Sequence, residues 1–364
     1  MKINDFIQQL YQFAPLDYAE DFDNVGLIIG DAHATIKGVL VSLDSTEAVV
    51  DEAIENNCNL IVAFHPIIFS GIKSLNPTNY VNRAVLKAIK HDIAIYAIHT
   101  ALDNHLEGVN AMMCRQLGLK NTKILIPKKG TIKKLTTYVP KDKAENLRRK
   151  LFKAGAGNIG NYSNCSFNTD GQGSFMGNEH SNPVYGEKLK LQYEDETQIN
   201  ITYSKHLEKQ VLNALFSNHP YEEVAYEIET LDNKNQTIGM GMLGEFEMPL
   251  SEKEFLDILK SVFGTPVVRH SGFLDKTISR VAVLGGSGAF AIPHALKHQA
   301  DALVTADLKY HDFFKAEHKI LLTDVGHFES EQYTKALLFD YINEKFTNFA
   351  VILSNTKTNP VHYY

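Results

Sequence analysis

The stretch that decides the fold is residues 37–66, KGVLVSLDSTEAVVDEAIENNCNLIVAFHP. It opens with an apolar strand pattern (37–43), continues with apolar residues at helical spacing (46–57) and closes with the apolar run 60–64. A strand, a helix and a second strand form a βαβ unit, which favours a parallel sheet covered by helices on both faces. The sequence therefore predicts an α/β fold.

The same pattern continues C-terminal to this unit. A helix pattern (81–90) leads into the apolar strand 93–98, which ends in the motif HTALD. His65, His99 and Asp103 therefore follow predicted strand ends, which is where open α/β sheets place their ligand sites.

A second group of strand and helix patterns lies near the C-terminus. Its members are the strands 279–284, 302–305, 320–323 and 349–353 and the helices 289–298 and 330–345. We interpret this group as a second βαβ-type half. Asp307 and His311 follow the second of these strands.

The segment between the two halves has a different character. Its predicted elements are, in order, the strand 132–139, the helix 143–154, the strands 162–167, 188–193 and 201–203, the helix 206–217 and the strand 224–230. This order approximates a βαββαβ ferredoxin-like module, with an exposed loop at 164–183 that is rich in Gly, Ser and Asn. We predict a discontinuous α/β metal-binding domain (1–130 and 234–364) interrupted by an inserted α+β domain (131–233).

Composition limits the class of protein. The 364 residues exceed the ~250–300 at which single cores stop growing, and the net charge of -7 disfavours broad nucleic-acid binding. No apolar run reaches the ~18–20 residues of a membrane span, and the N-terminus does not have the pattern of a secretory signal, so we expect a cytoplasmic protein. Cys58, Cys114 and Cys165 are scattered, which predicts neither a disulfide framework nor a thiolate zinc site.

His327 and Glu331 are four residues apart in GHFESE, at the entry to the last long helix pattern. On a helix this spacing puts both side chains on one face within one turn, so they can share a metal ion. The alternative is an ordinary solvated helix face. Asp324 precedes the pair at the end of an apolar strand, so we expect the pair to open onto the same sheet edge as His65 and Asp103.

His65 follows an apolar strand and is held extended by Pro66. The alternative for His65 is a satisfied core histidine, and the alternative for Asp103 is a helix cap or turn aspartate. Together with His327 and Glu331, they offer two imidazoles and two carboxylates. Such a set suits a divalent metal with open positions for water, zinc first and iron(II) or manganese as alternatives.

Six motifs in order resemble those of one family. They are DNVGLIIG (23–30), FHPIIF (64–69), HTALDN (99–104), TADLKYHD (305–312), DVGHFESE (324–331) and the terminal NTKTNPVHYY. The set is similar to that of the Nif-three-like proteins, also called GTP cyclohydrolase 1 type 2 homologs, and the middle segment resembles the PII-like insertion of the longer bacterial members. The resemblance implies a three-layer α/β/α fold, a dinuclear metal centre and toroidal homohexamers built from trimers.

The resemblance assigns the metal ligands to four residues, His65, Asp103, His327 and Glu331. It makes Glu331 the bridge between two ions. One expected ligand is missing, because Phe64 stands where the family has the first of two consecutive histidines. Three interpretations are open: one of two ions binds weakly, His99 substitutes for the missing ligand, or the site holds a single ion.

The family name implies hydrolytic ring opening of GTP, in which metal-activated water attacks the guanine ring and formate leaves. The candidate catalytic residues are His99 and His311, as proton shuttles, and the alternative is that they support the metal ligands by hydrogen bonds. The turn Gly285–Gly288 lacks the lysine of a phosphate-binding loop. We predict a metal-dependent hydrolase acting on GTP or a related nucleotide, with no membrane partner.

Two other functions stay open. A non-catalytic metal-binding or regulatory protein, in which the inserted domain senses a small molecule, fits the loss of a ligand at Phe64. Single-strand nucleic-acid binding in the toroid would need basic and aromatic residues along a pore, and the acidic balance counts against it.

Overall fold

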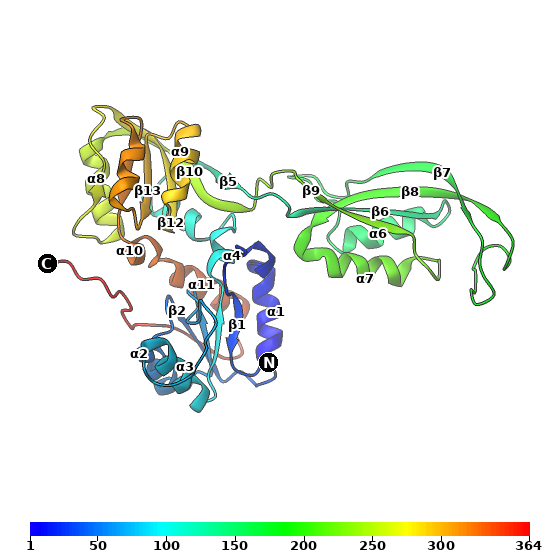
Figure 1. Ribbon diagram of the computed structural model, residues 1–364, viewed down its shortest axis with the longest axis horizontal. Helices are drawn as coiled ribbons and strands as arrows, with labels where there is room; N and C mark the ends of the chain where they lie inside the picture. The colour runs from blue at the N-terminus through cyan, green and yellow to red at the C-terminus, as the bar shows by residue number, and fades with distance from the viewer. The chain divides into compact units, whose positions relative to one another are not determined.

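The computed structural model describes residues 1–364 without a gap. The chain divides into two compact units, one made of Met1–Pro127 and Gln236–Tyr364 and the other of Lys128–Asn235. The larger unit contains two β-sheets and the smaller unit contains one (Figure 1).

The first sheet of the larger unit has the strand order β1-β4-β3-β2-β15. Strands β2 (Gly38–Ser42), β3 (Leu60–Ala63) and β4 (Ala94–Ala97) are parallel neighbours, with β1 (Gly26–Ile29) antiparallel at one edge and β15 (Ala350–Leu353) parallel at the other. Every residue of β2, β3 and β4 is buried, which explains their almost unbroken apolar sequences. The βαβ unit expected from residues 37–66 is therefore present.

Helices cover both faces of this sheet. On one face lie α2 (Glu47–Glu55) and α3 (Tyr80–Lys90), and on the other lie α1 (Ile3–Phe13) and α11 (Thr334–Lys345). Leu40 packs with α2 and α3, whereas its neighbours in β2 pack with α1 and α11, as the alternation of side chains along a strand requires. Figure 1 shows α2 and α3 across these strands from α1. The first half is thus three layers thick.

The second sheet has six strands in the order β11-β14-β13-β12-β10-β5. Their bounds are β5 (Lys120–Pro127), β10 (Gly239–Ser251), β11 (Arg269–His270), β12 (Thr277–Ser287), β13 (Ala302–Ala306) and β14 (Leu321–Asp324). The strands β12, β13 and β14 are parallel, and the others join them antiparallel.

The second sheet is also covered on both faces. One face packs against α5 (Val109–Leu117) and α8 (Glu252–Phe263), and the other against α9 (Ile292–Lys297) with the 3-10 turns η3 (Ala289–Ala291) and η4 (Tyr310–Ala316). The α/β/α layering therefore occurs twice in this unit, once in each half.

The two halves are separate sheets, which corrects the expectation that the ligands meet at one sheet edge. The last strand, β15, returns to the first sheet and pairs with β2 rather than with its neighbours in sequence. The predicted helix 330–345 is two helices, because α10 (His327–Glu331) packs on β12 whereas α11 packs on β2 and β15. The chain crosses from the second half to the first between α10 and α11.

Two short helices complete the larger unit. They are η1 (Leu16–Tyr18) after α1 and α4 (His99–Asp103) after β4.

The smaller unit has the element order βαββαβ. Its elements are β6 (Ile132–Pro140), α6 (Ala144–Lys153), β7 (Phe167–Phe175), β8 (Gln192–Ser204), η2 (Lys205–Leu207), α7 (Glu208–Asn218) and β9 (Tyr226–Leu231). The strands form one antiparallel sheet in the order β7-β8-β6-β9, and the core lies between this sheet and α6 and α7. This is the element order of a ferredoxin-like module.

Three details of the smaller unit differ from the sequence prediction. The strand expected at 162–167 lies later, as β7, inside the segment expected to be a loop, and the strands expected at 188–193 and 201–203 are one continuous strand, β8. Most residues of β7 are exposed, so its sequence has no buried face to signal a strand. Its continuous pairing with β8 holds it in place instead.

No helix in the structure combines the length and the apolar character that crossing a membrane requires.

Candidate metal centre

His65 lies directly after the end of β3, in the first half. Its backbone N–H donates to the carbonyl of Leu43 at 2.9 Å, so the pairing of β2 with β3 sets its position. Its ring Nδ1 lies 2.8 Å from Oδ1 of Asp44, which follows β2. Asp44 in turn accepts a hydrogen bond from the hydroxyl of Thr358, in the C-terminal segment.

His327 is the first residue of α10, in the second half. It follows β14 through Gly326, whose φ of 94° suits glycine and turns the chain into the helix. Its ring Nδ1 lies 2.6 Å from Oδ2 of Asp307, which follows β13. The hydroxyl of Ser287 donates to the same carboxylate.

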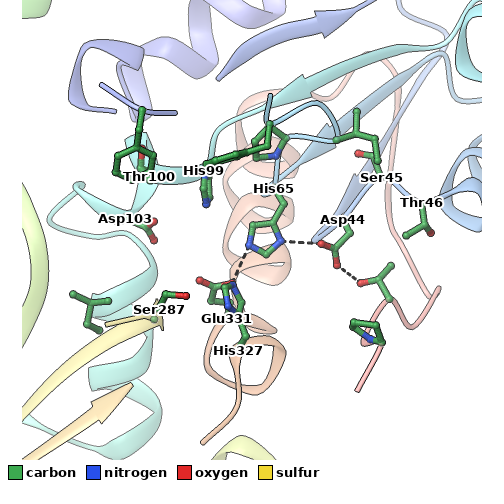
Figure 2. A pocket seen from close by; sticks show the side chains of 18 of the residues that line it. Asp44, Ser45, Thr46, His65, His99, Thr100, Asp103, Ser287, His327 and Glu331 are labelled. Atoms are coloured by element: carbon green, nitrogen blue, oxygen red, sulfur yellow. Dashed lines mark hydrogen bonds and ion pairs between the residues drawn. The ribbon is translucent and has the colours of Figure 1, made fainter. Parts of the chain in front are cut away.

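Glu331 stands between the two histidines. Its Oε2 lies 3.0 Å from Nε2 of His65 and 3.1 Å from Nε2 of His327. The potential ligand atoms of the three residues lie within 4.8 Å of one another. Figure 2 shows His65 in the middle, with Asp44 on one side and Glu331 on the other. The helical spacing predicted for His327 and Glu331 therefore brings both to one place, together with His65.

Gly286, at the end of β12, makes room for Glu331. A Cβ at this position would lie 2.4 Å from Oε1 of Glu331, and the φ of 65° is one that glycine adopts easily. The backbone N–H of Gly286 also donates to the hydroxyl of Ser330 at 3.0 Å, which fixes α10 against β12. The Gly285–Gly288 segment thus serves the site by its small size rather than as a phosphate-binding loop.

His65, His327 and Glu331 shift one another's pKa values. Burial lowers the pKa of His65, but the carboxylates of Asp44 and Glu331 outweigh it and raise that pKa to about 10. For His327, burial acts in the same direction and the carboxylates of Asp307 and Glu331 raise the pKa to about 11. Burial would raise the pKa of Glu331, but the two imidazoles hold it well below its usual range. Without a metal, the site is therefore a carboxylate between two protonated imidazoles.

Asp103, in α4, is the fourth predicted ligand and lies beside this group rather than in it. It lines the same cavity, but it is not among the three residues whose ligand atoms come together. Burial, followed by the charge of Glu331, raises its pKa well above the ordinary value of an aspartate. Such a carboxyl gains from a nearby cation, which would favour its charged form.

The donor set fits a divalent metal. In this site Nε2 of His65 and Oε2 of Glu331 are buried and have only their ion-pair contacts, and Oδ1 of Asp103 is buried without a hydrogen-bond partner. Buried polar atoms with unmet hydrogen-bonding capacity are costly, so this cluster indicates an ion that would contact all three. Both histidines direct Nδ1 to a carboxylate, which is the usual support of a metal-binding imidazole and leaves Nε2 for the metal.

Phe64 is the residue for which the family resemblance implies a histidine. Its side chain is fully buried and its ring centre lies 4.9 Å from that of His65 and 5.5 Å from that of His99. A phenyl ring has no donor atom, so this position adds packing and no ligand.

The two candidate catalytic histidines have different surroundings. His99 lines the cavity, and its Nδ1 lies 2.7 Å from Oδ1 of Asp23. The other oxygen of this carboxylate, Oδ2, accepts from the backbone N–H of Thr100 at 3.0 Å. Burial raises the pKa of Asp23, but the bonds from His99 and Thr100 outweigh it and lower that pKa. His311 lies in η4, is exposed and does not line this cavity. The structure therefore joins His99 to the site and leaves His311 outside it.

Sequence reasoning placed Asp307 after a strand but gave it no role, and it missed Asp44. Both residues orient a histidine, and both stand just after parallel strands, which is the same signal that identified His65. Thr358 carried no such signal, because only the fold brings the C-terminal segment to Asp44.

Two α/β halves that each direct a histidine to one buried carboxylate define an α/β protein with a candidate divalent-metal site. The chain belongs to the Duf34/NIF3 (NGG1p interacting factor 3) family, whose profile matches residues 1–360. This confirms the resemblance seen in the ordered motifs.

Close relatives cover the whole chain. A Bacillus subtilis (strain 168) protein named GTP cyclohydrolase 1 type 2 homolog is 37% identical over 97% of this chain and 96% of its own length. A Staphylococcus aureus (strain COL) protein of the same name is 35% identical over 100% of both chains. The crystal structure of a Bacillus cereus protein related to NIF3 matches with a TM-score of 0.87 at 35% identity, covering 100% of this chain and 99% of that one.

Proposed function

We propose that this protein is a divalent-metal-dependent hydrolase, with His65, His327 and Glu331 as metal ligands and Asp103 as a fourth. The observation that carries the proposal is the convergence of two imidazole Nε2 atoms on one buried carboxylate oxygen, at 3.0 and 3.1 Å. A metal ion replaces the two protons that otherwise hold this group together.

The proposed metal is one zinc ion per chain, with iron or manganese as alternatives, since imidazole and carboxylate ligands suit all three. A single ion is favoured over two because Phe64 offers no ligand atom. When bound, such an ion lowers the pKa of a coordinated water and polarises the group under attack.

His99 is the proposed proton carrier. Its Nδ1 is engaged by Asp23 at 2.7 Å, which leaves Nε2 as the atom that can take or give a proton in the cavity. The aspartate orients the ring, a role that needs no direct contact with substrate.

The name of the relatives, GTP cyclohydrolase 1 type 2 homolog, makes GTP or a related purine compound the first substrate to test. The reaction to test is hydrolysis of the guanine ring with release of formate, measured for GTP and for guanosine. Metal-loaded protein should release formate, and His99→Gln should slow the release while retaining the metal. If neither compound releases formate, the proposed reaction is contradicted. The metal site is tested independently by metal content.

Metal content tests the site itself. Elemental analysis of protein purified without chelator should find about one equivalent per chain, lost in His327→Ala. His311→Ala is the matched control, because this histidine is exposed outside the cavity and should not affect the metal. In Phe64→His, a restored ligand should raise the content toward two equivalents. Metal retained in full by His327→Ala would overturn the assignment.

A second candidate is a non-catalytic metal-binding or regulatory protein, and Phe64 is the observation that favours it. In this case the smaller unit would be a PII-like domain that senses a small molecule. We also propose a homohexameric assembly, which rests on the family resemblance. Size-exclusion chromatography with light scattering would test the assembly, and a monomer at micromolar concentration would contradict it.

A further inference from the structure

The candidate metal ligands His65, His327 and Glu331 line a cavity of about 930 Å³, which is large enough for a small organic ligand. Four aromatic side chains line it, Phe22, Phe69, Tyr80 and Phe290, and each is at least half exposed. Large aromatic side chains are stabilised when they are covered, so four of them left uncovered at one cavity mark a binding site.

The aromatic rings of Phe22 and Phe69 do not stack on each other or on a neighbouring ring. Phe22 and Phe69 have ring centres 6.3 Å apart at 47°, and Phe69 meets His99 edge-on, at 6.3 Å and 75°. Neither arrangement is a parallel stack, so the ring faces stay available to a planar partner. Phe69 also links the aromatic group to His99, the proposed proton carrier.

The cavity offers a phosphate chain no free cationic group. Its lining has no lysine or arginine, and its imidazoles His65 and His327 are each already held between two carboxylates. The guanidinium of nearby Arg83 is paired with Glu47 at 2.6 Å. Sites for phosphate normally use arginine, lysine or convergent backbone N–H groups, because each phosphate carries at least one negative charge.

Neutral hydrogen-bonding groups complete the lining. Ser45 lies just before the N-terminus of α2. It is buried, lines the cavity and has an Oγ without a hydrogen-bond partner. Thr46, Thr100 and Ser287 also line it (Figure 2), although the hydroxyls of Thr100 and Ser287 already donate to Asp23 and Asp307. Groups of this kind can pair with the ring nitrogens and carbonyls of a heteroaromatic compound without adding charge.

We propose that this cavity binds a planar heteroaromatic ring that carries no polyphosphate chain, stacked among Phe22, Phe69, Tyr80 and Phe290. The inference rests on the proposed function, since it names the class of compound that would meet the metal and His99. For a purine nucleotide it separates the base, which the aromatic lining fits, from the triphosphate, for which the lining has no free cationic group.

A series that varies only the phosphate charge tests the proposal. Binding of guanosine, GMP and GTP is measured by equilibrium dialysis on the full chain, as purified and after chelator treatment. Guanosine should bind at least about tenfold more tightly than GTP in the chelator-treated protein, and added salt should improve GTP binding, because salt screens repulsion. Tighter binding of GTP that weakens with salt would overturn the proposal.

Two variants test the aromatic contacts. Phe69→Ala and Phe290→Ala should each weaken guanosine binding about tenfold, the effect expected from loss of a stacking partner. Phe216→Ala is the control, because Phe216 is a similarly exposed aromatic residue in the smaller unit. Unchanged guanosine binding in both variants, or no binding at millimolar concentration, would overturn the inference.

Metal content measured on the same samples keeps the two proposals distinguishable. Ring binding lost with the metal retained contradicts only the ligand class. Metal absent from the purified protein contradicts the hydrolase, while the order of guanosine and GTP still decides the ligand class.

Discussion

The two halves of the larger unit build the site in the same way but leave it differently exposed. In each half a hydroxyl donates to an aspartate, which holds Nδ1 of a histidine whose Nε2 faces Glu331. The chain of groups is Thr358, Asp44 and His65 in the first half and Ser287, Asp307 and His327 in the second. The side chain of His65 is 21% exposed, however, and that of His327 is 41% exposed.

The lower exposure of the first half makes its hydrogen bonds the stronger ones. Solvent screens charge interactions, so the same hydrogen bond contributes more in the buried first half than in the open second half. The first half therefore holds its candidate ligand, His65, by the more buried contact, whereas the second half supplies the shared carboxylate and the more open side of the site.

Removing the Glu331 carboxylate, which faces both histidines, should cause the largest loss of zinc affinity. Glu331→Gln should weaken zinc binding by more than about a hundredfold, because loss of a ligand exceeds the 10–100-fold typical for loss of an outer partner. Competition with a chromophoric chelator measures it. Glu329→Gln is the control, since Glu329 is also buried in α10 but bonds to Asn359. Equal losses in both variants would point to general destabilisation of α10 instead.

Removing one aspartate at a time should separate the halves. Asp44→Asn and Asp307→Asn should each weaken zinc binding about 10–100-fold, as expected for the outer partners of metal-binding imidazoles. The loss should be larger for Asp44, because its pair with His65 is the more buried one. The same competition assay decides, and a larger loss at Asp307 would reverse the ranking of the two halves.

The metal-free protein should lose stability as the pH rises. The pKa values of His65 and His327 are raised to about 10 and about 11, above the ~6.5 of an unfolded chain. Their stabilising effect is complete below pH ~6.5 and declines toward those values, by roughly 2 kcal/mol at pH 9 after discounting for solvent.

Urea unfolding of chelator-treated protein at pH 6.5 and pH 9 measures this loss. The metal-bound protein should not show it, because the metal takes the place of the protons. His65→Gln should remove more of the pH dependence than His327→Gln. A chelated protein that is equally stable at both pH values would contradict the raised pKa of both imidazoles.

The smallest effects are expected from the hydroxyls that orient the aspartates. Thr358→Val should weaken zinc binding about threefold to fivefold, the effect of one hydrogen bond acting through Asp44. Ser287→Ala should weaken it less, because Asp307 is more exposed. Thr356→Val is the control, since its hydroxyl bonds to Glu52, away from both histidines. An equal loss in the control would show that the C-terminal segment acts through its overall packing.

The elements of this fold can be predicted where burial produces a recognisable pattern of apolar residues in the sequence. The strands β2, β3 and β4 are buried on both faces, so their apolar runs predict them, and His65 and His99 follow their ends as expected. The exposed strand β7 has no such pattern, and its sequence predicts a loop instead. The helical spacing of His327 and Glu331 was also local information, and α10 begins at His327 as that spacing required. The ligand assignment itself stays a prediction until the metal is measured.

The α/β class, the position of His65 at a strand end and the i, i+4 pair of His327 and Glu331 follow from the amino-acid sequence, because they depend on residues close together in the chain. The pairing of β15 with β2, the origin of the candidate ligands in two halves and the orientation of the histidines by Asp44, Asp307 and Thr358 depend on the folded chain. These contacts join segments up to 314 residues apart. Their free energy comes from packing and pairing across the whole fold, which no local pattern records.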